Sequence, residues 1–286
     1  CRLHFANEVR LRLRDDTEPL GPERLDPRTR GSMFHEIQFR FFRRCQAEGR
    51  SPSFALDLLD DIWRETVERY REEIAPAIAA VYDRETVQIR IDLRGWWRRR
   101  AEAPDGFEPA NAELAFGLGR VDPDHADPMS ALDPVPVDGR FAMRGSIDLV
   151  ERDAAGGLRV TDYKTGRPPS EPPEWTGHGE TLQPLVYAVA AEQLLGGPVR
   201  EGRLAYCTVK HGYRIDAVSA VDRSELVRLC GVIDDHVRRG FFPAAPREGA
   251  CRTCDYVMIC GHGEAARVER KDREKLSGLD AVRRVP

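Results

Sequence analysis

The chain has 286 residues, of which 41% are hydrophobic, and its formal net charge is −4. That length allows one large domain or two small ones, and the apolar content is sufficient for a core. The sequence has no run of about 18 apolar residues and no charged-then-apolar leader, so it indicates neither a membrane span nor secretion, and we expect a cytoplasmic protein. The negative charge excludes a protein that coats nucleic acid indiscriminately, so any contact with DNA must be local.

The first third of the chain is predicted to be helical. Apolar residues at helical spacing predict a helix over residues 29–46, with His35 in its first turns. Residues 53–104 repeat large apolar side chains every three or four positions, which predicts a helical insertion that breaks near Pro76. The arginines at 98–100 in this insertion either contact DNA or form the solvated basic face of an amphipathic helix.

Strands are predicted in the middle of the chain. A short strand at 112–117 carries Glu113, and a loop rich in Pro and Asp at 121–138 is expected to be exposed. Two further strands, at 139–150 and 158–164, are joined by a turn-rich Ala-Ala-Gly-Gly connection, which predicts a β-hairpin.

The second strand of this hairpin begins apolar and ends charged on one face. Because side chains alternate in a strand, Leu158, Val160, Asp162 and Lys164 share one face. A buried carboxylate and ammonium without partners would cost several kcal/mol, so we expect other groups to meet them. The hairpin can bring Asp148 close to Asp162.

A proline-rich loop at 167–179 leads into a helix that begins near Thr181 and ends at a Gly-Gly pair. This helix places Gln183 and Tyr187 one turn apart. A strand at 202–210, a helix at 224–239 and a charged tail at 264–284 are predicted to follow. The alternation of helices and strands predicts an α/β layer.

The acids and the lysine of the hairpin suit metal-assisted hydrolysis of a phosphodiester. Carboxylates hold Mg²⁺ or Mn²⁺ while leaving water on the ion. Such an ion polarises the scissile phosphate and acidifies a water, and a lysine can position that water and offset negative charge. An isolated Asp-x-Lys would carry little weight, because solvated pairs of this kind are common.

Five segments extend the pattern along the chain, in the order GSMFHE (His35), AELAFG (Glu113), GSID (Asp148), VTDYKTG (Asp162 and Lys164) and QPLVY (Gln183 and Tyr187). In these segments the sequence resembles the RecB-like exonuclease domains of the PD-(D/E)XK nuclease superfamily. The resemblance implies a single domain over 1–286 with a restriction-endonuclease-like core, in which helices flank a mixed central sheet, together with a helical insertion and a C-terminal iron-sulfur segment.

The resemblance also implies the roles of individual residues. It implies Mg²⁺ or Mn²⁺ bound by His35, Glu113, Asp148, Asp162 and the Tyr163 carbonyl, and catalysis by Asp148, Asp162 and Lys164 with Gln183 and Tyr187 beside them. Three alternatives to these roles remain open. His35 can be a helix residue that forms ordinary hydrogen bonds, Glu113 can pair with an arginine, and Gln183 and Tyr187 can simply belong to an amphipathic helix face.

Three cysteines lie within ten residues, at Cys251, Cys254 and Cys260 in the segment 248–263, and need a fourth ligand to close a metal site. The resembled AddB-type helicase-nucleases bind a four-iron, four-sulfur cluster with one upstream and three downstream cysteines, which implies Cys1 as the fourth ligand. Zinc with His262 is the alternative. Three scattered cysteines are expected in the core, at Cys45, Cys207 and Cys230.

The expected function is a metal-dependent DNA exonuclease domain that acts in double-strand-break repair on single-stranded DNA or an unwound duplex end. Because the sequence contains no Walker loop, unwinding is expected to come from a helicase partner. The chain begins at Cys1 without a methionine, from which we expect a fragment of a longer protein. The alternatives are a free-standing CRISPR-associated exonuclease and a catalytically silent iron-sulfur scaffold that binds DNA.

Overall fold

The computed structural model describes residues 21–283 except 103, 121, 171–181, 220–222, 243–250, 252–253 and 255–262. The chain forms two compact units, one over Leu20–Leu226 and one that takes in Val227–Val285. Among the described residues, no helix combines the length and apolar character that crossing a membrane requires.

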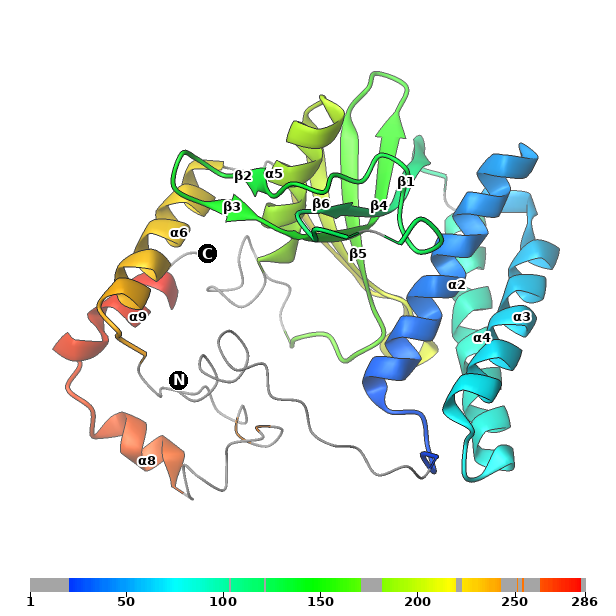
Figure 1. Ribbon diagram of the computed structural model, residues 1–286, viewed down its shortest axis with the longest axis horizontal. Coiled ribbons are helices and arrows are strands. Elements are labelled where there is room, and N and C mark those ends of the chain that lie inside the picture. The colour runs from blue at the N-terminus through cyan, green and yellow to red at the C-terminus, as the bar shows by residue number, and fades with distance from the viewer. Residues whose placement is uncertain are drawn as a thin grey trace. The chain divides into compact units, whose positions relative to one another are not determined.

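The larger unit is built on a mixed five-stranded sheet (Figure 1). Its strand order is β1 (Phe107–Phe116), β4 (Gly145–Asp153), β5 (Leu158–Lys164), β6 (Val199–Tyr206) and β7 (Ile215–Ser219). Only β5 and β6 run parallel, and α5 (Gln183–Leu195) connects them. A separate ribbon pairs β2 (Val135–Pro136) with β3 (Ala142–Met143). The predicted mixed sheet with flanking helices is confirmed.

Three long helices precede the sheet, namely α2 (Pro27–Glu48), α3 (Leu56–Ile74) and α4 (Ala79–Glu102), with the short η2 (Pro52–Phe54) between the first two. The Asp26 carboxylate caps α2 by accepting the amides of Arg28 and Thr29. Helix α3 ends at Ala75, which has a left-handed backbone, directly before the predicted break at Pro76. The helices expected within 53–104 are therefore present.

Two hydrophobic cores cover the two faces of the sheet. Side chains of α2, α3 and α4 form the first core with Leu149 and Tyr163 of the sheet. The second core lies between α5 and the opposite face, where Leu158 and Val160 pack. The predicted alternation of β5 is thus confirmed, since Val160 and Tyr163 pack on opposite faces.

Several predictions for the strands and loops were wrong. The first strand begins at Phe107 rather than at residue 112, and β7 was not predicted. The strand expected at 202–210 starts earlier and ends at Tyr206, and Val209–His211 form the 3₁₀ helix η3 instead. The loop at 121–138 is not wholly exposed, because Asp127 is buried and accepts the backbone amide of Ala112. That bond satisfies an amide beside the β-bulge of β1.

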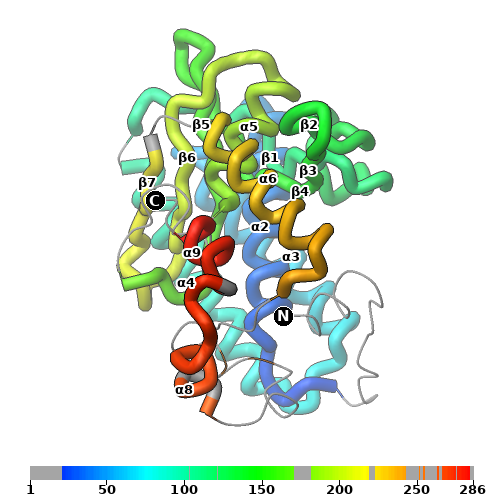
Figure 2. Tube along the Cα trace, turned by 90° about the vertical axis from the view of Figure 1, so that its left-hand side faces the viewer, coloured from blue at the N-terminus to red at the C-terminus, as the bar shows by residue number. Residues whose placement is uncertain are grey.

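In the second unit, the charged tail expected at 264–284 contains α8 (Glu264–Glu269), η5 (Glu274–Leu276) and α9 (Ser277–Arg283). Helix α6 (Arg223–Arg238) crosses the boundary between the units, and α9 lies beside its C-terminal half (Figure 2). A Cβ atom at Gly278 would lie 1.8 Å from the ring of His236, so the two helices pack too closely there for a larger residue.

Candidate functional site

Strands β1 and β4 both interrupt their alternation at a carboxylate. Glu113 has a φ of 51°, in the left-handed region that a glutamate rarely adopts. Ala112 and Leu114, which a regular strand would place on one face, consequently pack in different cores. Ile147 and Leu149, on either side of Asp148, likewise pack in different cores. The register of the ladder places Asp148 opposite Glu113. Both carboxylates therefore emerge at one irregular point of the sheet.

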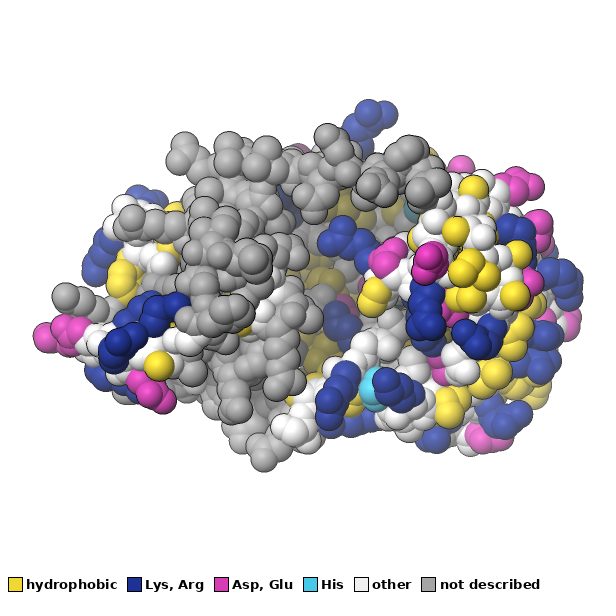
Figure 3. Space-filling model, turned by 90° about the horizontal axis from the view of Figure 1, so that it is seen from below, with side chains coloured by type: hydrophobic (Ala, Val, Ile, Leu, Met, Phe, Trp, Pro, Cys, Tyr) yellow, Lys and Arg dark blue, Asp and Glu magenta, His cyan; other side chains and the backbone are white. Residues whose placement is uncertain are grey.

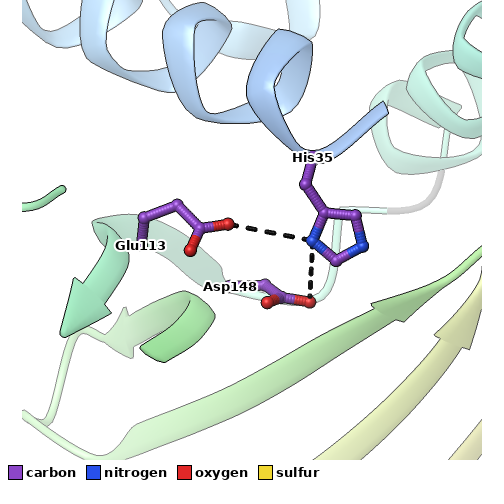
Figure 4. Close-up of side chains that lie close together, drawn as sticks. All are labelled: His35, Glu113 and Asp148. Atoms are coloured by element: carbon purple, nitrogen blue, oxygen red, sulfur yellow. Dashed lines mark ion pairs between the residues drawn. The ribbon is translucent and has the colours of Figure 1, made fainter. Parts of the chain in front are cut away.

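Helix α2 brings His35 to this point. Its Nδ1 lies 3.4 Å from a carboxylate oxygen of Asp148 and 3.8 Å from one of Glu113. Figure 4 shows the three side chains converging from α2, β1 and β4. One ligand atom from each of the three residues lies within 4.8 Å of the others, which is close enough for all three to share one ion.

Neighbouring groups fix the two carboxylates. The Ser146 hydroxyl donates to Glu113 over 2.8 Å, and the Tyr163 backbone N–H donates to Asp148 over 2.6 Å. Among the residues that the structure describes, the partners of Glu113 are thus a serine and a histidine, not the arginine of the alternative interpretation. Asp127 accepts the amide of Ala112, and its own amide donates to the Glu113 carbonyl, so it braces the bulge from outside the sheet.

Ser146 and Asp127 were not identified from the sequence. Ser146 lies two residues before Asp148 in GSID, and this proximity was the one local signal that could have found it. The contact of Asp127 with β1 depends on how the loop folds back, so sequence spacing could not reveal it.

The electrostatics of His35 reflect its two acidic neighbours. Burial opposes the charged imidazolium, but the carboxylates of Asp148 and Glu113 outweigh burial and raise the pKa of His35 to about 10. In the metal-free protein the histidine is therefore a cation between two anions. A metal ligand must be a neutral imidazole, so an ion that binds here displaces a proton.

Asp162 and Lys164 complete the acidic cluster from β5. The β4–β5 ladder ends at the pair of Leu149 and Thr161, so Asp148 and Asp162 face each other where the strands separate. Asp162 is only 3% exposed. Burial and then the Asp148 charge raise its pKa, while Lys164 lowers it. The Lys164 ammonium lies 2.7 Å from Asp162.

Helix α5 contributes Gln183 and Tyr187 to the same region. The Gln183 side-chain oxygen accepts a hydrogen bond from Lys164 over 2.8 Å, which fixes the ammonium between β5 and α5. Tyr187 packs against the start of β4, within 3.7 Å of a Cβ built at Gly145. Burial and then the charges of Asp162 and Asp148 raise the pKa of Tyr187, so its hydroxyl keeps its proton at neutral pH.

Tyr163 lies on the other side of β5. Its ring packs edge-on against Trp96 at 5.7 Å in the helical core, so only its backbone faces the acidic cluster. Its N–H already serves Asp148. A role for its carbonyl as a metal ligand remains a prediction.

The cysteine site falls largely outside the described residues. Cys1, Cys260 and His262 are not among them, whereas Cys251 and Cys254 are half-buried and joined by a backbone hydrogen bond of 3.4 Å. The iron-sulfur segment therefore remains a prediction. Two of the scattered cysteines, Cys45 and Cys207, are buried as expected, but Cys230 is only half-buried.

Comparison with known proteins identifies what the chain is similar to. The model of the PD-(D/E)XK nuclease superfamily matches residues 1–261. A relative from Desulforudis audaxviator (strain MP104C), described as a subunit of an ATP-dependent helicase/deoxyribonuclease, is 32% identical over 154 residues. That match covers 49% of this chain and 13% of the relative, so the chain corresponds to a small part of that protein.

Proposed function

The chain belongs to the PD-(D/E)XK nuclease superfamily, and from this premise we propose that it is a metal-dependent deoxyribonuclease domain with exonuclease activity. The observation that carries the proposal is the convergence of His35, Glu113 and Asp148 beside the Asp162–Lys164 pair. By likeness to the helicase/deoxyribonuclease relative, we further propose that the domain works with a helicase partner in double-strand-break repair.

The side chains present fit a small divalent cation. Three carboxylates and one imidazole offer mainly oxygen donors, which suit Mg²⁺ and Mn²⁺ better than softer metals. Asp148 and Asp162 would hold the ion, with Glu113 and His35 completing the donor set. When bound, the ion polarises the scissile phosphate and acidifies a water.

The proposed task of Lys164 follows from how it is held. Its ammonium is held between the carboxylate of Asp162 and the amide oxygen of Gln183, so its position is set before substrate arrives. From there it orients the attacking water and balances the negative charge that develops on the phosphate. Gln183 is a positioning residue, because it acts through the lysine.

His35 links metal binding to proton release. At neutral pH it is protonated and neutralises part of the charge of Asp148 and Glu113. With a cation held by the carboxylates, His35 would give its proton to solvent and its Nδ1 could serve as a ligand. This exchange keeps the three carboxylates from facing one another without a counter-charge.

We also propose that Cys1, Cys251, Cys254 and Cys260 bind a four-iron, four-sulfur cluster. The support is the order of the cysteines in the sequence, one upstream and three downstream. Protein purified without oxygen should contain about four irons per chain. Zinc without iron, or an iron content that Cys1→Ala leaves unchanged, would contradict this assignment.

The nuclease proposal is tested by cleavage of end-labelled single-stranded and duplex DNA, with and without Mg²⁺ or Mn²⁺. We expect cleavage that requires the cation and releases short products progressively from an end. Cleavage that persists in excess chelator would reject the metal mechanism, and products of internal cleavage alone would reject the exonuclease assignment.

A further inference from the structure

A group of basic side chains surrounds the end of the sheet at which β5 and β6 finish. It consists of Arg98 and Arg99 in the last turns of α4, Arg167 beyond β5, and Lys210 and His211 in η3, and is called the basic end surface below. This end of the sheet is linked to the active-site lysine, because the Cys207 N–H, directly after β6, donates to the Lys164 carbonyl at the end of β5 over 2.9 Å. Figure 3 shows one face of the molecule, on which several Lys and Arg side chains lie beside a histidine.

These cations are not neutralised within the part of the chain that the structure describes. Arg98, Arg99, Arg167 and Lys210 form no ion pair there, whereas the neighbouring Arg94 pairs with Asp60 at 2.7 Å. Burial and then the charges of Lys210 and Arg167 lower the pKa of His211, while the charge of Asp92 raises it, so Lys210 and Arg167 lie close enough to His211 to affect it.

The backbone beneath the basic end surface is held in place. The buried Asp92 accepts the Val209 N–H over 2.9 Å and pairs with Arg30 at 2.7 Å, which ties η3 to α4. Tyr213 packs so closely on α4 that a Cβ at Gly95 would lie 1.7 Å from its hydroxyl.

The arginine at position 99 is also held. The Arg99 guanidinium stacks over the ring of Tyr213 at 4.7 Å. Arg98, Arg99 and Lys210 therefore lie on two elements that are fixed to each other, α4 and η3, whereas Arg167 lies in the segment after β5.

Apolar side chains lie among these cations. Ile91 is 48% exposed and Val209 is 52% exposed. They border a hollow between α4 and η3. The residues that line it are Ile91, Arg94, Gly95, Arg98, Arg99, Glu102, Val209 and Tyr213, and Glu102 is the one carboxylate among them. Positive charge interleaved with exposed apolar faces matches a single strand, which offers phosphates and unstacked bases together, better than a duplex, whose bases are stacked inside.

We propose that the basic end surface holds single-stranded DNA that leads to or from the active site. Arg98, Arg167 and Lys210 contact successive phosphates, and bases lie over Ile91 and Val209 in the hollow. The contacts are to backbone and base faces, so this binding is independent of sequence. The inference rests on the proposed nuclease function, because it assigns the path of that substrate.

The test compares two double variants with equal loss of charge. Arg98→Gln with Lys210→Gln removes two cations of the basic end surface. Arg43→Gln with Arg84→Gln removes two cations elsewhere, and Arg84 lies about 21 Å from Arg98 along α4. Binding of labelled single strands is measured in chelator at several salt concentrations, so that cleavage does not interfere.

We expect the Arg98/Lys210 variant to bind single strands at least tenfold more weakly at low salt. The slope of log affinity against log salt should fall by about 1.4, as the loss of two phosphate contacts predicts. The Arg43/Arg84 variant should match the wild type. Equal slopes for both variants would overturn the inference, and an equal loss for a duplex of the same length would overturn its assignment to single strands.

Failure of this inference can be separated from failure of the nuclease proposal. Asp162→Asn protein should bind single strands with the wild-type salt slope but should not cleave them. Cleavage by that variant would reject the proposed active site while leaving the binding result intact. An unchanged slope in the Arg98/Lys210 variant would reject the binding surface while leaving the active site intact.

Discussion

Strands β4 and β5 carry two buried charged clusters that differ in how their charges are balanced. At one position Glu151 of β4 accepts from Arg159 of β5 at 2.6 Å and pairs with Arg100 at 2.6 Å, so its carboxylate faces two cations. A few residues away, Asp148 and Asp162 face each other, and among the described residues only Lys164 and the titratable His35 balance these two carboxylates and that of Glu113.

The difference separates a structural cluster from a functional one. A buried carboxylate with two guanidinium partners has its charge neutralised by the protein itself. In the cluster with three carboxylates, burial and then the charge of Asp148 raise the pKa of Asp162, and the carboxylates of Asp148 and Glu113 raise the pKa of His35 against the effect of burial. Burial alone does not mark an active site, whereas burial without sufficient counter-charge does.

The largest expected effect concerns the acidic cluster. Replacing Asp148 or Asp162 with Asn should lower the cleavage rate at least a thousandfold, because each residue serves the ion and not the core. The measurement is the initial rate on end-labelled single strands at saturating Mn²⁺, with circular dichroism to verify folding. A folded Asp148→Asn protein with wild-type rates would remove the distinction between the clusters.

The second prediction concerns the neutralised cluster. Glu151→Gln removes the carboxylate that pairs with Arg100 and one of the two that pair with Arg159, which keeps Asp105 at 2.6 Å, so it should lower the free energy of unfolding by about 3 kcal/mol. Urea unfolding measures the loss. Cleavage per folded molecule should stay within a few fold of wild type, and its abolition in folded protein would show that this network also serves the reaction.

The third prediction is a stability gain from loss of a catalytic group. Because the pKa of Asp162 is raised, the metal-free folded protein binds its proton more tightly than the unfolded chain does, and stability falls as pH rises from about 4 to about 7. Asp162→Asn removes this dependence. In chelator at pH 7 the variant should be more stable than wild type by on the order of 1–2 kcal/mol.

Urea unfolding at pH 4.5 and pH 7 checks this prediction, with Lys210→Gln as a surface control. The gain should be small at the lower pH, where Asp162 is protonated in the folded state and partly protonated in the unfolded chain. A gain of equal size at both pH values would show that ionisation of Asp162 is not its origin.

The smallest expected effect is the number of protons that the protein releases when it binds a metal ion. At pH 7.5, binding of Mn²⁺ should release up to one proton, because His35 has a raised pKa until the ion binds. Calorimetry in two buffers with different ionisation enthalpies measures the release. His35→Gln should bind Mn²⁺ about tenfold more weakly and release fewer protons. The same proton release in this variant would place the titrating group elsewhere.

Local patterns in the sequence were sufficient for several features of this protein. The period-two alternation of β5 placed Asp162 and Lys164 together with Val160 on one face, and the break at Pro76 separated two helices, as the structure has them. The same reasoning missed β7 and the first half of β1, because edge strands are defined by their pairing and carry weak patterns of their own.

The sequence by itself determined which side chains were available and on which elements they lie: His35 on a helix, and Asp148, Asp162 and Lys164 on a hairpin. Only the tertiary structure decided which carboxylates would lack counter-charge. Asp148 and Glu151 lie on the same strand, yet Arg100 reaches Glu151 from α4 while His35 reaches Asp148 from α2. Those pairings join residues far apart in the chain, and they depend on helix packing and on the left-handed backbone of Glu113, which no local pattern encodes.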